Sequence, residues 1–540
     1  MTDQPRRFDA VIVGAGFSGL YMLYRLRALG LSVRVLEAGS GIGGTWFWNR
    51  YPGARCDIES IEYSYSFSPE LQQQWQWSER YPSQPEVLRY LEHVADRFEL
   101  RNDIELDTRV VAARFDEPAG RWTIETARGE RLSAKYCVTA VGCLSAPNFP
   151  RIPGRERFTG PMHHTGQWPP GGVDVAGKRV GVIGTGSTAI QLIPAVAKQA
   201  AHLTVFQRTP NFSIPARNQP LSPELEHDIK ARYPEVREQA RQTFFGLALL
   251  DVGATPAAAL SPAEQRAEME RRWALGGLHL LGVFPELLAV PEANAVVAEF
   301  VRDKVRAVVH DPAVAARLLP GDYPVGCKRI CLDTDYYETF NRDNVTLVDA
   351  RDSPIVEITP TGVRTADHDY ALDVIVLATG FDAMTGALNN IDVRGRGGLA
   401  LKDKWAVGPR GYLGLATGGF PNFLTITGPL SPSVISNMVV AIEQHVDWIT
   451  ELIAHMEQNH IDLIDATPEA EDAWVAHVAM VGGSTIFTAP TCNSWYLGAN
   501  VPGKPRVFTP YVGGIGPYGQ AIQEVARNGY QGFTLTPAPR

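Results

Sequence analysis

The sequence predicts an α/β protein with two Rossmann-like domains and a helical insertion. Short apolar runs that end in glycine clusters alternate with longer helical patterns, which is typical of βαβ units and parallel sheets. The order strand, glycine turn, helix, strand occurs twice along the chain. Residues 217–326 instead have a pattern typical of several consecutive helices. With 540 residues, the chain has room for about two to four domains of ordinary size.

The first unit begins near the N-terminus. An apolar run over residues 9–13 leads through the turn GAGFSG into a helical pattern over residues 20–30, and a second strand follows over residues 32–37. The turn carries a G-x-G-x-x-G motif, formed by Gly14, Gly16 and Gly19. Such glycines make the tight turn, admit a pyrophosphate and pack helix on strand. Glu37 lies 23 residues after the first glycine, where it can bind a ribose 2′-OH, so the turn, including Ser18, predicts a site for FAD or NAD.

The second unit has a strand over residues 178–183, the turn GTGSTA and a helix over residues 190–200. Its motif ends in alanine, an accepted variant, and consists of Gly184, Gly186 and Ala189. Gln207 replaces the acid of the first unit, and Arg208 and Thr209 follow. Guanidinium and hydroxyl groups favour a 2′-phosphate, although Arg208 could also be a solvated surface charge. The second site therefore suits NADP, and two such sites in one chain imply hydride transfer from NADPH to FAD at the first.

The sequence pattern of residues 217–326 predicts several consecutive helices, and we interpret this segment as an insertion. A capping residue followed by proline marks three helix starts, at Ser222-Pro223, Ser261-Pro262 and Asp311-Pro312. Glu264 adds capping-box spacing to the second start. The apolar stretch over residues 244–258 fits either a substrate lid or a helix core, and we favour the helix core.

Two further segments set the predicted domain boundaries. The unbroken apolar run over residues 373–380 is typical of a strand buried in a parallel sheet. Proline and glycine crowd residues 144–172, which predicts a crossing between domains. We predict an FAD-binding domain, an NADP-binding domain and a helical insertion, over residues 1–143 with 381–540, 144–216 with 327–380, and 217–326, respectively.

The composition argues against several classes of protein. The hydrophobic and charged fractions, 45% and 20%, are those of an ordinary globular protein. A net charge of −9 argues against nucleic-acid binding. The N-terminus lacks the apolar core of a signal peptide, and no run of about 18 apolar residues occurs, so we expect a cytoplasmic protein outside the membrane. The six cysteines form no C-x-x-C pair and no zinc spacing, and we expect all of them to be free thiols.

Signatures of other chemistries are missing from the sequence. A disulfide reductase needs a redox-active cysteine pair beside its flavin, whereas Cys56, the cysteine nearest the first unit, has no neighbouring partner. The chain contains neither G-x-S-x-G nor H-E-x-x-H, and we predict no metal site. His163 and His164 could form a metal or acid–base pair, but adjacent side chains point in different directions, which favours a structural role for at least one.

Two longer motifs resemble those of a known family. The fingerprint FxGxxxHxxxW(P/D) of type I Baeyer–Villiger monooxygenases is matched by Phe158, Gly160, His164 and Trp168. A second family motif is matched by GGTW and YPG, which begin at residues 43 and 51, together with Asp57. Similar stretches follow, namely FNRDNV, ATGFDAMTG and NSWYLGANVPGK. Nearly the whole chain resembles this family of class B flavin monooxygenases, particularly the phenylacetone, steroid and cyclohexanone monooxygenases.

The resemblance implies an enzyme that contains FAD, consumes NADPH and O2, and converts a cyclic or aryl-alkyl ketone to an ester or lactone through a flavin C4a-peroxide. Keeping that peroxide anionic requires a fixed cation. The family's arginine corresponds to Arg329 in GCKRICLD, the acid that positions it to Asp57, and a residue that helps hold the NADP 2′-phosphate to Lys328. On sequence alone, Arg329 could be a surface ion-pair residue and Asp57 a helix cap.

The resemblance also assigns positions around the cofactors and the substrate. Beside the flavin it places Thr45, Trp46, Phe47, Trp48, Tyr63, Val110 and Met438. Near the nicotinamide and in the second turn it places Arg55, Cys56, Trp495, Thr185, Ser187, Thr188, Ile190 and Gln191. Around the substrate it places Cys143, Ser433, Val434, Ile435 and Met438, of which Cys143 could equally be a plain buried residue. The long fingerprint is expected to couple domain rotation to cofactor position.

Two alternatives to ketone oxidation stay open. A flavin monooxygenase that oxidises thioethers or amines would share both dinucleotide motifs, and a nucleotide-binding sensor would use both cofactors without turnover. In either case, we expect small-molecule partners, no nucleic acid, no membrane and a monomeric chain.

Overall fold

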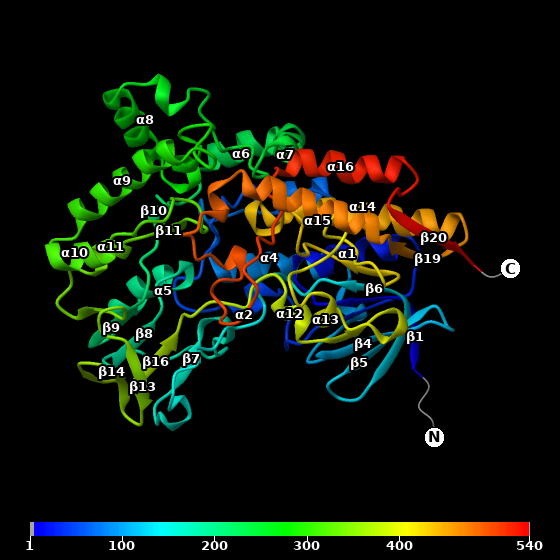
Figure 1. The fold of residues 1–540 in the computed structure, drawn as a ribbon, viewed down its shortest axis with the longest axis horizontal. Helices are drawn as coiled ribbons and strands as arrows, with labels where there is room; N and C mark the ends of the chain where they lie inside the picture. Colours follow the sequence, from blue (N-terminus) through cyan, green and yellow to red (C-terminus); the bar gives the residue numbers. More distant parts are fainter. Residues whose placement is uncertain (1–4, 539–540) are drawn as a thin grey trace.

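The structure is a computed structural model that describes residues 5–538. Its larger sheet lies at the lower right of Figure 1 and has the strand order β17-β4-β5-β6-β1-β2-β3, with β18 paired to β6. Neighbouring strands are parallel except at β4–β5 and β5–β6. The strands are β1 (Arg6–Val13), β2 (Val33–Leu36), β3 (Ile104–Glu105), β4 (Val110–Asp116), β5 (Arg121–Thr126), β6 (Arg131–Thr139), β17 (Asp392–Arg394) and β18 (Phe423–Thr425).

A second sheet of five strands, at the lower left of Figure 1, is entirely parallel. Its order is β12-β9-β8-β16-β7. The strands are β7 (Met162–His164), β8 (Arg179–Ile183), β9 (His202–Gln207), β12 (Val345–Asp349) and β16 (Val374–Leu377). Two sheets with strand–glycine turn–helix units confirm the predicted α/β class.

Both predicted glycine turns connect a strand to a helix. β1 leads into α1 (Phe17–Ala28), and β8 leads into α5 (Ser187–Ala197). Each helix begins three residues before the predicted start, because the glycine turn itself forms the N-cap, at Gly16 and Gly186. The strand predicted to continue to Gly380 ends earlier, with β16.

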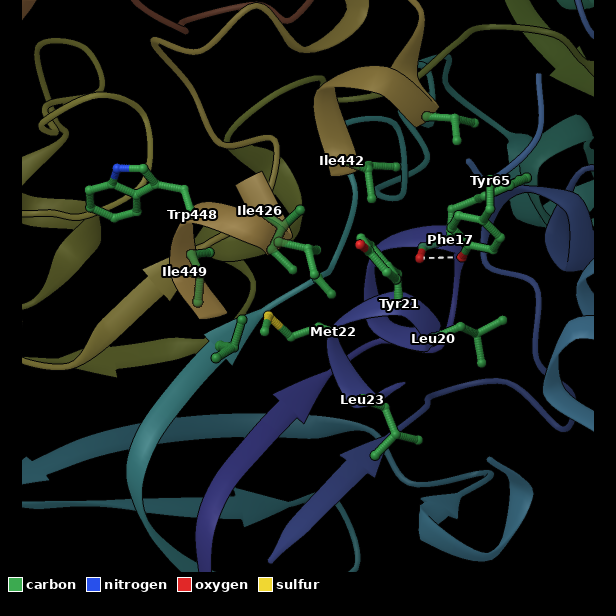
Figure 2. Packing of buried hydrophobic residues seen from close by; sticks show 14 of the residues in the cluster. Phe17, Leu20, Tyr21, Met22, Leu23, Tyr65, Ile426, Ile442, Trp448 and Ile449 are labelled. Carbon is green, nitrogen blue, oxygen red and sulfur yellow. Dashed lines mark hydrogen bonds between the residues drawn. The ribbon is translucent and has the colours of Figure 1, made fainter. Parts of the chain in front are cut away.

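The core beside the larger sheet forms where α1 packs against α14 (Met438–Gln458), as Figure 2 shows. α1 contributes Leu20, Tyr21, Met22 and Leu23, all at most 2% exposed. Tyr65 adds a polar anchor, because its hydroxyl donates to the backbone oxygen of Phe17 at 2.5 Å (Figure 2). This contact holds the first turn of α1 directly after the glycine motif.

The helices predicted in the insertion are present, and all three capping residues accept the expected backbone hydrogen bonds. Ser261 and Glu264 form the predicted capping box. The helices are α6 (Pro223–Ala231), α7 (Tyr233–Gln242), α8 (Pro262–Leu275), α9 (Pro291–Val308) and α10 (Pro312–Leu318).

The helix core favoured for residues 244–258 is wrong. No α-helix occurs between α7 and α8, and only a short 3₁₀ turn occupies residues 257–259. Gly246 has a φ of 71°, which interrupts a helix, and Pro256 follows in extended conformation. The apolar side chains of this segment are instead used in packing and in lining a pocket described below.

The remaining elements are short or peripheral. The other helices are α2 (Thr45–Trp48), α3 (Pro69–Gln74), α4 (Gln84–Arg97), α11 (Tyr336–Thr339), α12 (Gly386–Asn389), α13 (Leu401–Lys404), α15 (Pro468–Gly483) and α16 (Ile515–Arg527). The other strands are β10 (Ser213–Pro215), β11 (Cys331–Asp333), β13 (Ile355–Thr359), β14 (Gly362–Thr365), β15 (Asp369–Ala371), β19 (Ile461–Ala466) and β20 (Phe533–Pro537). Across residues 5–538, no helix is both long and apolar enough to cross a membrane.

The expectation of six free thiols is also wrong. Cys327 and Cys492 form a disulfide with a Cα–Cα distance of 6.3 Å, and both cysteines are fully buried. The two are 165 residues apart, so no local spacing could reveal the pair. The other four cysteines are free and buried.

Removing this disulfide should lower the free energy of unfolding by about 2–4 kcal/mol, because the cross-link restricts the unfolded chain. We expect urea to unfold the wild type at a lower concentration when dithiothreitol is present, whereas a Cys327→Ala/Cys492→Ala variant should not respond to the reductant. Thiol titration of the denatured, unreduced protein should find four groups. Six titratable groups would contradict the bond.

Candidate active site

The first glycine turn has space for a ligand but none for side chains of its own. Gly14 has a φ of 106°, and a Cβ placed there would lie 2.5 Å from the backbone oxygen of Ala140. A Cβ on Gly19 would lie 1.8 Å from the oxygen of Gly14. The bare turn at the N-terminus of α1 is therefore a cradle of the kind a pyrophosphate requires.

Glu37 stands beside this turn, at the end of β2. Its carboxylate accepts hydrogen bonds from the backbone nitrogens of Ala15 at 2.8 Å and Gly39 at 2.7 Å. Burial raises its pKa despite these bonds. Each carboxylate oxygen has a further lone pair, so Glu37 can hold the turn and also accept from a ribose hydroxyl. These residues fit the adenosine end of FAD.

The second turn has the same backbone form. Gly184 has a φ of 113°, and a Cβ there would lie 2.3 Å from the oxygen of Ala378. Gly186 is open, because the nearest atom to its added Cβ is 4.0 Å away. Gln207 is buried and donates to the backbone oxygen of Arg317, whereas Arg208, the next residue, is exposed.

Two cations stand near this second turn. Burial, together with the neighbouring charge of Arg208, lowers the pKa of Lys328 to about 8. Neither side chain forms an ion pair with a described carboxylate. Lys328 instead lies over the ring of Tyr323. Two close cations without an acidic partner fit a phosphate dianion, which is the group that distinguishes NADP from NAD.

A cavity of about 850 Å³ connects the two turns, and most of the predicted site residues line it. Those residues are Gly14, Gly16, Ser18, Glu37, Thr45, Trp46, Trp48, Arg55, Cys56, Asp57, Tyr63, Val110, Cys143, Gly186, Ser187, Thr188, Gln191, Arg329, Val434, Met438 and Trp495. Such a volume is at the upper end of the range for small-molecule sites.

Other predicted residues do not reach the cavity wall. Phe47 instead packs over the turn of Gly39 and Gly41, where an added Cβ on either glycine would lie within 3 Å of its ring. Ser433 is fully buried. Ile435 lines the smaller pocket described below. The other predicted residues absent from the cavity wall are Gly19, Gly184, Thr185, Ala189, Ile190, Arg208, Thr209 and Lys328. The contacts of Phe47, Ile190 and Ser433 with a ligand therefore stay predictions, since these three residues do not line the cavity.

Arg329 is one of the cations that line the cavity. Its Nε and Nη2 donate to the two oxygens of Asp57 at 2.8 and 2.9 Å, and Nη1 donates to the backbone oxygen of Val434 at 2.9 Å. Although burial alone would lower it, the pKa of Arg329 is raised, because the charge and hydrogen bonds of Asp57 outweigh desolvation. The two-pronged ion pair therefore fixes a permanent positive charge in place.

Arg329 also lines a second, smaller pocket of about 30 Å³. Apart from Arg329, its wall is mainly aliphatic and aromatic, including Phe245, Leu247, Leu281, Ile435, Phe487 and Tyr496. Phe245 and Leu247 belong to the segment mistaken for a helix, and Tyr496 follows Trp495. The sequence predicted none of these three as site residues by number. The signals were the substrate-lid alternative for residues 244–258 and the position of Tyr496 next to a predicted contact.

The long fingerprint lies at the edge of the five-stranded sheet, where β7 pairs with β16. His164 uses both ring nitrogens: Nδ1 accepts from the backbone nitrogen of Gly166 at 3.0 Å, and Nε2 contacts the oxygen of Gly380 at 3.1 Å. Burial lowers its pKa to about 4, so the ring is neutral near pH 7 and Nε2 donates. This arrangement ties β7 to the loop after β16. Trp168 packs in the core of this sheet.

Within residues 5–538, no group of three or more His, Cys, Asp or Glu side chains is arranged to hold a metal ion. His163 is only partly buried, and its ring lies tilted beside that of Trp168, whereas His164 hydrogen-bonds to the backbone.

Residues 11–248 match the family model described as pyridine nucleotide-disulphide oxidoreductase. The cysteines of that stretch, Cys56, Cys137 and Cys143, are all free, so it contains no disulfide. Among solved structures, the oxidized steroid monooxygenase bound to NADP superposes with a TM-score of 0.94 at 52% identity, covering 98% of this chain and 100% of that one.

Curated relatives span the whole chain. An acetone monooxygenase (methyl acetate-forming) of Gordonia sp. is 44% identical over 98% of this chain and 99% of its own. A Baeyer–Villiger monooxygenase of Pseudooceanicola batsensis is 43% identical over 97% and 95%, and phenazine N-monooxygenase of Lysobacter antibioticus is 42% identical over 98% and 98%. The chain therefore belongs to the Baeyer–Villiger monooxygenase family, whose members are flavin-dependent enzymes that use FAD and NADPH.

Proposed function

We propose that this enzyme oxidises a ketone to an ester or lactone at Arg329, using FAD, NADPH and O2. One observation carries the proposal: the guanidinium held by Asp57 stands in the wall between a cofactor-sized cavity and an apolar pocket. A sensor that only binds nucleotides has no need of such a cation. We expect the enzyme to act as a cytoplasmic monomer.

We assign one cofactor to each glycine turn, and therefore to each of the two large sheets. We assign FAD to the turn of Gly14 and Glu37, in a domain of residues 1–143 and 381–540. We assign NADPH to the turn of Gly184 and Gly186, with Lys328 and Arg208 on the 2′-phosphate, in a domain of residues 144–216 and 327–380. Residues 217–326 are then the insertion.

When bound and reduced by NADPH, FAD would activate O2, one atom of which the ketone gains. The chain's own contribution is electrostatic. As the carbonyl oxygen gains negative charge, Arg329 stabilises it from a fixed position and without reorganisation. Asp57 holds the guanidinium in that position. The apolar walls of the pocket beside Arg329 exclude water, which strengthens the interaction between the two charges.

The pocket's lining supports an apolar ketone. Its leucines, Ile435 and the rings of Phe245 and Phe487 suit a small apolar group next to the carbonyl, because the pocket has a volume of only about 30 Å³. The rest of the ketone would lie in the cavity of about 850 Å³ that Arg329 also lines. Oxidation of a heteroatom is the second candidate, because phenazine N-monooxygenase is a full-length relative. Arg329 favours the ketone, since a thioether or amine offers no carbonyl oxygen to stabilise.

The test is to incubate the yellow protein with NADPH, O2, a panel of ketones and one thioether, followed by mass spectrometry. An ester or lactone one oxygen heavier than its ketone supports the proposal. Sulfoxide as the sole product would replace it with heteroatom oxidation. Binding of FAD without NADPH-driven bleaching would instead support the sensor.

Lys328→Gln should raise the KM for NADPH by about 10- to 100-fold, because one or two charge-assisted hydrogen bonds to the 2′-phosphate are lost. The KM for NADH, which has no 2′-phosphate, should not change. The exposed Lys198→Gln serves as the control for loss of a positive charge. Because the pKa of Lys328 is lowered to about 8, its charge is lost as the pH rises through that value. The wild-type KM for NADPH should therefore increase above pH 8, and this increase should be absent in Lys328→Gln. Equal effects on NADPH and NADH would contradict the assignment.

A further inference from the structure

Tyr496 is held rigidly beside Arg329. It lies in a 3₁₀ turn, η9 (Trp495–Leu497), and is only 2% exposed. Thr509 donates to its backbone oxygen from both N and Oγ1, at 3.0 and 2.9 Å. Its ring packs edge-on against Phe487, with ring centroids 5.8 Å apart. Backbone and ring are thus fixed before any ligand enters.

The hydroxyl of Tyr496 makes no hydrogen bond to any residue in the described range 5–538. Tyr65 and Tyr518 instead donate to the backbone oxygens of Phe17 and Leu413. The hydroxyls of Tyr81 and Tyr336 also lack a hydrogen bond within residues 5–538, but of these three unbonded tyrosines only Tyr496 lines the pocket beside Arg329. A buried tyrosine hydroxyl ordinarily finds such a partner. Burial raises the pKa of Tyr496, while the nearby charge of Arg329 lowers it, so the hydroxyl stays protonated and able to donate.

The other polar groups of the apolar pocket are already committed. Asn437 donates to the backbone oxygen of Glu62 at 2.9 Å and accepts from the nitrogen of Val439 at 3.1 Å. Ser436 donates to the backbone oxygen of Ser433 at 3.0 Å. Among the lining side chains, unused donors are left on Tyr496, on one N–H of the Asn437 amide, and on the guanidinium of Arg329, where three of five N–H groups are engaged.

We infer that the Tyr496 hydroxyl donates a hydrogen bond to the carbonyl oxygen of the ketone, as a second catalytic residue beside Arg329. A carbonyl oxygen has two lone pairs and can accept from both groups at once. The two donors fix which face of the carbonyl is presented to the cofactor cavity. This inference rests on the proposed ketone oxidation.

Tyr496→Phe removes only the hydroxyl and is tested with two substrates of matched shape, phenylacetone and benzyl methyl sulfide. We expect kcat/KM for phenylacetone to fall about 10- to 100-fold, because a preorganised donor to the developing oxyanion is lost. Oxidation of the sulfide should not change, since the sulfide has no carbonyl oxygen. Equal losses for both substrates would mean that Tyr496 only shapes the pocket and would overturn the inference.

A spectroscopic measurement supplies a readout independent of turnover. The infrared stretch of phenylacetone labelled with ¹³C at its carbonyl, bound to oxidised enzyme with NADP⁺, should move to higher frequency in Tyr496→Phe, because the carbonyl loses a hydrogen bond. Tyr518→Phe, which loses a satisfied hydroxyl in the distant core, should leave the stretch unchanged. An identical stretch in wild type and Tyr496→Phe would also overturn the inference. Failure of the proposed function is recognised separately, because wild-type enzyme would then form no ester from phenylacetone or any ketone of the panel.

Discussion

Arg329→Ala should reduce kcat/KM for ketone oxidation by at least about 10³-fold, whereas NADPH should still reduce the flavin. Among the described residues, Arg329 is the one cationic side chain that lines both the cofactor cavity and the apolar pocket. Its loss leaves the carbonyl oxygen without a fixed positive charge. Stopped-flow absorbance measures flavin reduction, and product analysis measures ketone oxidation.

Breaking an ion pair also costs stability, so the comparison needs a matched variant. Arg80→Ala breaks a similarly enclosed pair, in which Arg80 contacts Glu59 with both side chains 16% exposed. That variant should retain ketone oxidation. Asp57→Asn tests whether Asp57 holds the guanidinium in place, because the amide keeps the shape of the carboxylate but offers only one acceptor atom. If Arg329→Ala kept wild-type ketone oxidation, the assignment of Arg329 as the oxyanion cation would be wrong.

Local chemistry explains what the sequence predicted well. The two glycine turns were identifiable because a turn that admits a phosphate requires glycine at fixed offsets, and the structure places both between strand and helix. The helix starts in the insertion were also predictable, because a capping residue and a proline occupy fixed positions at the start of a helix. Each of these signals lies within a few residues.

Long-range contacts account for what the sequence could not predict. Arg329 and Asp57 are 272 residues apart, and only the family resemblance linked them. Cys327 and Cys492 had no such link and were predicted to be free. Residues 244–258 have the apolar composition of a helix core, but they pack as irregular chain because tertiary contacts and Gly246 outweigh their helical propensity.

Gly19→Ala should weaken FAD binding by at least about 100-fold, the equivalent of roughly 3 kcal/mol, which overpacking against a rigid backbone commonly costs. The added Cβ would lie 1.8 Å from the oxygen of Gly14, a backbone atom that cannot move without displacing the turn. The variant should purify with little yellow colour, measured as the ratio of flavin absorbance to protein absorbance, and calorimetry should give the Kd of the apoprotein for FAD.

Gly30→Ala separates damage to the cradle from damage to the helix. Gly30 follows the other end of α1 with a φ of 77°, and no atom lies within 4 Å of an added Cβ. That substitution should cost about 1–2 kcal/mol of stability through its left-handed backbone but leave the FAD content unchanged. The two variants thus differ in what they disturb: Gly30→Ala strains a left-handed residue after the end of α1, whereas Gly19→Ala, in the helix itself, forces the turn of Gly14 to move. A Gly19→Ala protein with a full complement of FAD would show that the flavin does not depend on this turn, and the assignment of FAD to the larger sheet would then fail.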